Sequence, residues 1–420
     1  MAHILLTSIL VMKHVFSILL VLSFIWTAGG SLLAESNYSN PVFLHDWPDP
    51  TFWRGSNGVF YTFSTAGTKY NNGRGKILSS FDLVQWDSIS EVVFSQQTVV
   101  RLHEIGRELW APHVTQVNGQ WLMYLTCYNS AQQTSIVVLS LRSKTFPRTN
   151  GCCGPWELVS TLTNSTETGI YDTIDPFVIT DPTTRQVWLF FGSTNGIYRV
   201  ELAPDGMSLA PDAKYIHIAG RTIGEDPSRH QVFESAYLYP HEGYWYLFVS
   251  SGLYSNDTYD IKVGRSQSLT GPFYDAKGHD MVDGAAQTLL STPNDQGVYW
   301  GPGGLGGIVT DDQGRTFALY HCHTTAVPAT VSSYVPRPLM LEPLYWDKKT
   351  GWPYFKSSEP QASSSYPDLS QSVSLPQIQA CSRQVEGYYS LYGLRIDHAP
   401  QATCIVRYTD GSTEKIIRKQ

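Results

Sequence analysis

The sequence predicts an all-β protein, a five-bladed β-propeller with a short C-terminal β-rich extension. Three observations support this class. One unit of two strands and a turn recurs five times, no long stretch shows the helical period of 3.6 residues, and Gly and Pro (34 and 24 of 420 residues) are spread along the chain. Many short strands joined by turns are typical of such a composition.

Charge and composition exclude several other classes. The chain carries 29 Lys and Arg against 36 Asp and Glu, a net charge of −7, and 42% of its residues are hydrophobic. This balance indicates a globular protein with a large core. No basic block is present to bind phosphates, so we expect no nucleic-acid partner. We also expect a monomer.

The first element is a targeting segment. No acidic residue precedes Glu35, and an apolar run at 15–26 is followed by small residues. We predict a signal peptide at 1–34, and hence a secreted, extracellular protein with no membrane contact after cleavage. The alternative is an uncleaved anchor interrupted by Lys13.

Sequons and cysteines fit a secreted glycoprotein. The sequons begin at Asn37, Asn164 and Asn256, and six cysteines are present. Six cysteines allow 15 pairings, so connectivity stays open. We expect Cys381 and Cys404 to pair, because both stand alone in the C-terminal tail. No CxxC pair is present, which argues against structural zinc.

The repeat then organises residues 35–355 as the propeller. Each copy begins with a polar or small dipeptide and continues with an apolar strand, a turn and an aromatic-rich strand, as in TFWRGSNG and VFYTFS. With further strand candidates between the copies, such as SIVVLSL at 135–141, each copy supplies the four strands of a propeller blade. A β-sandwich with coincidental similarity is the alternative. The five dipeptides are Asp49-Pro50, Ala111-Pro112, Asp175-Pro176, Ser235-Ala236 and Gly303-Gly304.

Two elements follow the propeller. Residues 356–379 are rich in Ser, Pro and Gln and are predicted to be a linker or a surface wrap. Residues 380–420 form the C-terminal extension and contain strand-like pieces. This extension is either a partial accessory module or an extra strand pair on the propeller.

Carboxylates at equivalent blade positions predict a site. Asp49 and Asp175 begin copies one and three, while Glu234 stands one residue earlier in copy four, in the column that Trp110 occupies in copy two. Equivalent points on the innermost strands surround the propeller axis, so these acids are expected to meet at one mouth. A shift of one residue reverses the face of a strand, so we expect Glu234 to lie just before the strand proper.

Three acids in one pocket suit glycoside hydrolysis. One acid must protonate the leaving oxygen, while a carboxylate activates water or attacks the sugar. Crowded like charges raise the pKa of at least one acid and keep it protonated. The simpler reading is that Asp-Pro starts a turn, but the copies that begin with Ala and Gly show that the repeat itself needs no acid.

With these motifs, the sequence resembles glycoside hydrolase family 43, five-bladed propeller enzymes that act on arabinose- and xylose-containing polysaccharides. The resemblance covers roughly residues 45–355 and is greatest to the α-1,5-arabinanases, through the segments at 189–202, 216–221 and 259–284. The motifs that carry it are WPDPTF (47–52), SSFDLVQW (79–86), ELWAPHV (108–114), TIDPFVI (173–179), FESAYLY (233–239) and GPGG (301–304).

The resemblance implies roles for the acids. Asp49 would be the general base and Glu234 the general acid, with Asp175 orienting Glu234 and tuning its pKa. Family members invert the anomeric centre, which implies a base and an acid roughly 6.5–9.5 Å apart. The sequence departs from the arabinanase pattern beside the pocket, where Pro48 stands in place of a usual His and GPGG lacks its usual final His.

Four further residues are candidates for substrate binding. Trp110 and Trp47 stand beside the acids, where an aromatic ring can stack on a sugar, although blade packing explains most of the 12 Trp. Ser193 and Tyr237 are expected to line the pocket.

His321 is the candidate metal residue. It ends the aromatic-rich strand of copy five, and the arabinanase resemblance implies that a His there faces a structural calcium ion, or its waters, on the axis. Calcium prefers oxygen ligands, so water would hold most of such an ion. A hydrogen-bonded core His is the alternative, and we expect that the reaction requires no cofactor.

The sequence therefore predicts a secreted inverting glycosidase that cleaves α-L-arabinofuranosyl linkages, in α-1,5-arabinan by preference. Its expected partner is a plant cell-wall polysaccharide or oligosaccharide. A β-xylosidase or an arabinofuranosidase acting on arabinoxylan is the enzymatic alternative. A non-catalytic carbohydrate-binding propeller is the alternative from another class.

Overall fold

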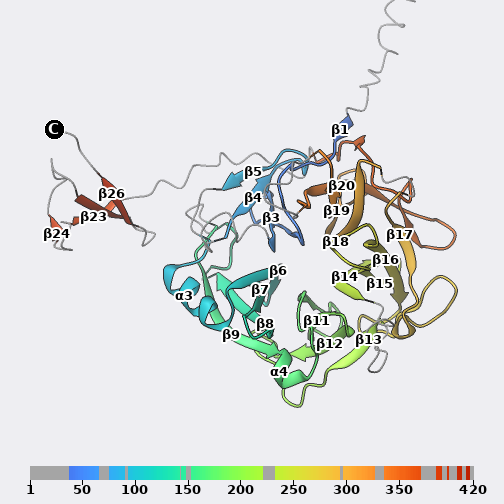
Figure 1. The fold of residues 1–420 in the computed structure, drawn as a ribbon, viewed down its shortest axis with the longest axis horizontal. Coiled ribbons are helices and arrows are strands. Elements are labelled where there is room, and N and C mark those ends of the chain that lie inside the picture. The colour runs from blue at the N-terminus through green and yellow to red at the C-terminus, as the bar shows by residue number, and fades with distance from the viewer. Residues whose placement is uncertain are drawn as a thin grey trace, which may run out of the picture.

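The computed structural model describes a chain built almost entirely of strands. It covers residues 37–65, 75–89, 93–141, 143–147, 153–220, 232–293, 297–326 and 335–369, together with four strands of the tail. Five four-stranded antiparallel sheets surround a central axis (Figure 1). The prediction of a five-bladed propeller is confirmed.

Each blade is one continuous stretch of chain whose strands follow in order from the axis outward. Blade one holds β2 (Thr51–Arg54), β3 (Phe60–Phe63), β4 (Ile77–Ser80) and β5 (Asp87–Ile89). Blade two holds β6 (Glu108–Val117), β7 (Gln120–Tyr128), β8 (Thr134–Leu141) and β9 (Trp156–Asn164). Blade three holds β10 (Phe177–Thr180), β11 (Val187–Ser193), β12 (Gly196–Leu202) and β13 (Ile216–Ala219). Blade four holds β14 (Phe233–His241), β15 (Tyr244–Ser251), β16 (Asp260–Ser266) and β17 (Gln287–Leu290). Blade five holds β18 (Tyr299–Thr310), β19 (Thr316–Thr324), β20 (Leu339–Trp346) and β21 (Pro353–Tyr354).

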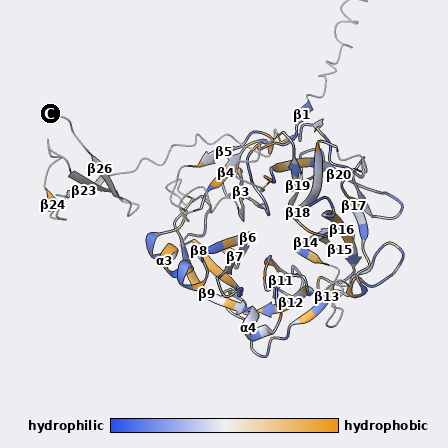
Figure 2. Cartoon of the chain, in the orientation of Figure 1, coloured by the Kyte–Doolittle hydropathy of each residue, from blue (hydrophilic) through white to orange (hydrophobic). Residues whose placement is uncertain are grey.

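The second strand of each blade is buried on both faces. Every residue of β11 and of β19 is buried. Continuous apolar burial is expected for a strand that packs against a neighbouring sheet on each side, and this explains the aromatic-rich runs of the repeat. Hydrophobic residues are accordingly distributed over all the blades rather than gathered in one (Figure 2).

Helices are few in the described ranges. α3 (Gln96–Ile105) precedes blade two, α4 (Ser165–Thr168) follows it, and the single-turn η2 (Met281–Asp283) lies in blade four. The Ser95 side chain caps α3 by accepting from the Thr98 amide. The sequence did not predict α3, because its buried stripe of Thr98, Val99 and Leu102 is too short to show a helical period. No helix in the described part of the chain could span a membrane.

The N-terminal segment joins blade five to blade one. β1 (Asn37–Ser39) pairs with β22 (Ser363–Ser365), and the Asn40 side chain donates 2.9 Å hydrogen bonds from Nδ2 to the carbonyls of Leu341 and Gln361. Further along, the Asp368 amide bonds Asp311 Oδ2. The first part of the predicted 356–379 segment therefore follows the propeller surface, whereas residues 370–379 lie outside the described residues.

The C-terminal extension forms a sheet of its own. β23 (Val385–Tyr389), β24 (Arg395–Ile396), β25 (Cys404–Tyr408) and β26 (Thr413–Ile416) pair in the order β24-β23-β25-β26. It is thus not an extra strand pair on a blade. The predicted signal peptide at 1–34 and Cys381 lie outside the described residues, so the cleavage and the Cys381–Cys404 pairing stay predictions. Cys127 and Cys322 are buried free thiols.

Candidate active site

The propeller axis holds a cavity that is lined by residues from all five blades. Each blade contributes three consecutive residues from the start of its repeat. The tracts are 49–51, 111–113, 175–177, 235–237 and 304–306. In four blades these are the positions that the repeat aligned, whereas in blade five the tract begins at Gly304, one residue after the Gly303 that the repeat aligned. The ring carries Asp49 and Asp175.

Each tract begins with a residue in the left-handed backbone region. The φ angles are 49° at Asp49, 40° at Ala111, 56° at Asp175, 54° at Ser235 and 57° at Gly304. Non-glycine residues rarely adopt this region, and strained backbone clusters at functional sites. The ring therefore imposes one local conformation on four different residue types.

This kink also explains how Glu234 reaches the site. Glu234 lies within β14, opposite Ser250, and not before the strand as the sequence suggested. The register shifts between Glu234 and Tyr237, around the left-handed Ser235. A bulge of this kind re-aims side chains. Glu234 does not line the axial cavity itself, but its charge interacts with those of Asp49 and Asp175, which do.

Asp49 is held by donors from blades one and five. The Thr65 hydroxyl donates to Asp49 Oδ2 at 2.8 Å, and Arg337 Nη1 donates to Oδ1 at 3.1 Å. The Asp49 amide donates to His321 Nδ1 at 2.9 Å. These bonds orient a carboxylate that lines the cavity and whose side chain is 17% exposed, so water can reach it, as a base that activates water requires.

Glu234 accepts two short hydrogen bonds. Ser193 Oγ donates to Oε2 and Tyr259 Oη to Oε1, both at 2.6 Å. Burial raises the pKa of Glu234, the two hydroxyl donors lower it, and the charge of Asp49 raises it again. The net direction is upward, which favours the protonated acid that a leaving group needs.

Asp175 connects the two sides of the site. Its Oδ2 accepts from the amide and the hydroxyl of Ser235, both at 3.1 Å, and Ser235 is the residue next to Glu234. Burial, followed by the charges of Glu234 and Asp49, raises the pKa of Asp175 well above its usual value. Asp175 therefore holds the backbone beside Glu234 and competes with it for a proton.

The four residues predicted to bind substrate lie in different surroundings. Trp110 is half-buried and stacks on Tyr128 with ring centroids 4.5 Å apart, so part of its surface stays open. Ser193 bonds Glu234, and Tyr237 lines the axial cavity. Trp47 is only 1% exposed and its indole N–H donates to Thr62 in the core between blades one and five, so the expectation that it contacts substrate is wrong.

The surroundings of His321 do not fit a metal ligand. An amide can only donate, so His321 Nδ1 accepts from Asp49, and the neutral ring carries its proton on Nε2. That nitrogen lies 3.5 Å from Arg337 Nη1, a fixed positive charge. Burial, then the charge of Arg337, lowers the pKa of His321 well below its usual value. Among the described residues, no group of three His, Cys, Asp or Glu could hold a metal ion.

Sequence reasoning missed three residues of this site: Thr65, Tyr259 and Arg337. Tyr259 opens a segment that carries the arabinanase resemblance, so that segment was a usable signal. Arg337 lies 288 residues from Asp49 in the chain. No local pattern connects two residues at that distance, and only the closed ring brings them together.

A five-bladed propeller that brings Asp49 and Asp175 to its axial cavity, with the charge of Glu234 close enough to interact with both, defines a class, the glycoside hydrolases, which cleave O-glycosyl bonds with paired acids. Comparison with known proteins gives the family. The model of the glycosyl hydrolases family 43 matches residues 38–353. The chain belongs to this family and is a glycoside hydrolase.

Several relatives carry specific names. The chain is 27% identical over 326 residues to the extracellular endo-α-(1→5)-L-arabinanase 1 of Bacillus subtilis, covering 73% of this chain and 91% of that protein. It is 28% identical over 332 residues to a probable arabinan endo-1,5-α-L-arabinosidase C of Aspergillus flavus, covering 75% and 95%. The solved α-L-arabinanase of Cellvibrio cellulosa superposes with a TM-score of 0.61 at 26% identity, covering 74% of this chain and 95% of that chain.

Proposed function

We propose that this chain is a secreted, inverting glycoside hydrolase that cleaves α-L-arabinofuranosyl linkages in α-1,5-arabinan. The arabinan-related names of its relatives support the substrate, and one relative is named extracellular. The observation that carries the chemistry is the grouping of three acids at the propeller axis: Asp49 and Asp175 line the cavity, and Glu234 interacts electrostatically with both.

In the proposed reaction, the Asp49 carboxylate takes a proton from a water molecule that attacks the anomeric carbon. Glu234 donates its proton to the departing glycosidic oxygen, so no covalent sugar intermediate forms. Arg337 and Thr65 keep the Asp49 carboxylate oriented, while Ser193 and Tyr259 hold Glu234. Asp175 positions Glu234 through Ser235 and favours a proton on the acid pair.

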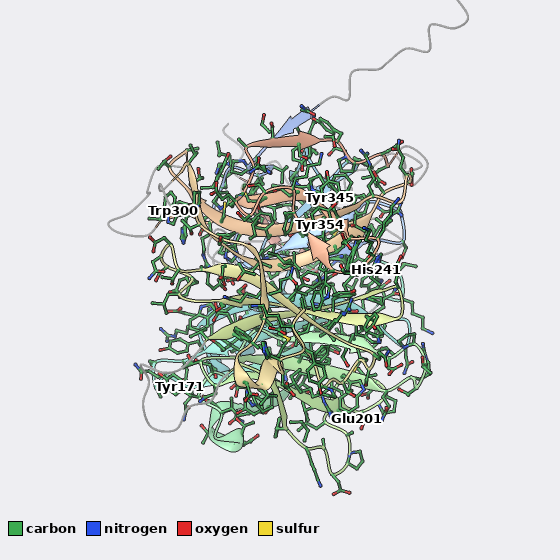
Figure 3. All side chains as sticks on the ribbon, turned by 90° about the vertical axis from the view of Figure 1, so that its right-hand side faces the viewer. Tyr171, Glu201, His241, Trp300, Tyr345 and Tyr354 are labelled. Atoms are coloured by element: carbon green, nitrogen blue, oxygen red, sulfur yellow. The ribbon has the colours of Figure 1, made fainter. Side chains whose placement is uncertain are left out.

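The surface around the pocket supports a polymeric substrate. Figure 3 views the propeller from the side, with Tyr171 and Trp300 at one face and Glu201 and His241 at the other. Glu234 lies at the start of the strand that His241 ends, so the acids open toward the face of Tyr171 and Trp300. Tyr171 and Tyr254, on loops of that face, are 59% and 51% exposed. Aromatic rings with open faces can bind sugars along a chain.

The substrate test is an assay on a panel. The purified protein is incubated with linear arabinan, arabinoxylan and xylobiose, and products are followed by proton NMR. We expect arabino-oligosaccharides from linear arabinan, whose first-formed anomer is inverted. Release of arabinose alone would indicate exo action, and turnover confined to arabinoxylan or xylobiose would contradict the arabinan proposal.

The export proposal has a separate test. Expression of the full chain in a secreting host, followed by N-terminal sequencing of the product in the medium, is expected to give a start near residue 35. Retention of residues 1–34 in a membrane fraction would indicate the uncleaved anchor instead.

A further inference from the structure

A buried arginine lies at the centre of the candidate site. Arg337 is only 6% exposed. Its Nη1 lies 3.1 Å from Asp49 Oδ1 and 3.5 Å from His321 Nε2, and its guanidinium carbon lies 4.8 Å from the ring centroid of Tyr254. An arginine buried this deeply costs free energy unless charge and ring contacts compensate it, and here both are present.

The acids supply a reason for a positive charge at this place. Asp49, Asp175 and Glu234 interact electrostatically with one another in a half-buried pocket. The charge of Arg337 reaches Glu234 as well as Asp49. A fixed cation therefore offsets part of the repulsion among the carboxylates.

The same place is unfavourable for a calcium ion. Calcium is bound by oxygen atoms, whereas the Nε2 side of His321 presents a ring N–H with the Arg337 guanidinium beside it. Asp49 Oδ1 lies 3.6 Å from Nδ1 on the other side of the ring and is already paired with Arg337. Two like charges a few ångströms apart, with little water between them, repel strongly. Gly304 adds no side-chain ligand, and a Cβ there would lie 2.5 Å from the His321 ring.

We propose that Arg337 is the resident cation of this active site, in the position beside His321 where a divalent metal was expected, and that catalysis by this chain is independent of calcium. Arg337 is then a positioning residue, which acts by holding the Asp49 carboxylate. The inference rests on the proposed role of Asp49 as base.

The first test uses the wild-type protein and no substrate. After treatment with EDTA and desalting, the protein is titrated with calcium in a calorimeter, and its metal content is measured by mass spectrometry. We expect no stoichiometric metal and no heat of specific binding. Stoichiometric calcium in the untreated protein, or saturable binding at one site, would overturn the inference even if no sugar substrate were found.

The second test measures hydrolysis of linear arabinan. We expect kcat/KM of the EDTA-treated wild type to stay within about twofold of the untreated enzyme, and Arg337→Ala to lose about a hundredfold, chiefly in kcat. Arg337→Lys is expected to retain more activity than Arg337→Ala, and millimolar guanidinium to restore part of the activity of Arg337→Ala. Calcium is expected to restore none.

Arg265→Ala is the matched control. Arg265, like Arg337, donates a side-chain hydrogen bond and lies over aromatic rings, but its acceptor is the Tyr246 hydroxyl rather than a carboxylate, and its rings are those of Tyr244 and Trp352. This variant is expected to lose stability without any rescue by guanidinium. Loss of wild-type activity in EDTA with recovery in calcium, or equal guanidinium responses of the two variants, would refute the proposal. If Arg337→Ala does not fold, the calcium titration and the EDTA assay of the wild type still decide whether this chain binds calcium and needs it for catalysis.

Discussion

Glu342 is a buried carboxyl that connects blade five to the segment after it, and its effect on the free energy of unfolding can be predicted quantitatively. Glu342 lies on β20, is 3% exposed, and accepts hydrogen bonds at Oε1 from the Tyr320 hydroxyl and the Gln361 amide. Burial raises its pKa from 4.5 to about 7, although both hydrogen bonds lower it. The folded state therefore favours the protonated carboxyl more than the unfolded state does.

The sign and size of the effect follow from this pKa. The contribution of Glu342 to stability is fully present below about pH 4.5, and it is lost as the pH rises through about 7. The change from 4.5 to about 7, at 1.36 kcal/mol per unit, corresponds to about 3 kcal/mol. Glu342→Gln keeps the shape of the side chain and does not ionise, so it avoids this loss.

The assay is urea unfolding, followed by tryptophan fluorescence, of the wild type and Glu342→Gln at about pH 4.5 and about pH 8. The difference in unfolding free energy between the two proteins is expected to move by about 3 kcal/mol in favour of the variant between these pH values. Comparing the same two proteins at both pH values cancels the other titrating groups.

Glu242→Gln is the control, because the Glu242 side chain is 68% exposed. For this variant we expect no such movement. A difference for Glu342→Gln that stays constant from low to high pH, or that moves toward the wild type, would refute the reasoning.

Three further predictions concern the acids and the ring beside them. Asp49→Ala and Glu234→Gln are each expected to lower kcat by about 10²–10⁴-fold on linear arabinan while circular dichroism shows a folded protein, and full activity in either would refute its assigned role. Asp49→Ala is also expected to lower the melting temperature, because it leaves the buried Arg337 without this carboxylate. Tyr259→Phe removes the 2.6 Å donor to Glu234 Oε1, so the pKa of Glu234 is expected to rise further and the alkaline limb of the kcat/KM profile to move to higher pH. An unmoved limb would show that Tyr259 does not act on the general acid. Trp110→Ala is expected to raise KM for arabinan more than it lowers kcat, and unchanged steady-state kinetics would remove Trp110 from the substrate site.

The fold could be predicted because the repeat is a local pattern. Each copy of the repeat contains its own turn and its own second strand, which is buried on both faces. An example is QVWLFFGS, the segment that forms β11. α3 could not be predicted in the same way, since only a short stripe of it is buried. Trp47 was misplaced because proximity to Asp49 in the chain says nothing about the direction of its side chain, which packs into the core.

The sequence by itself determined the five blades, the family resemblance and the three acids, because strand patterns and aligned repeat positions depend on residues close together in the chain. The tertiary structure alone decided how those acids are held. Left-handed backbone at Asp49, Asp175 and Ser235 aims them, and Arg337 and His321 reach Asp49 across 288 and 272 residues. Such contacts depend on closing the ring of blades, and the free energy of that closure is distributed over the whole chain rather than contained in any one motif.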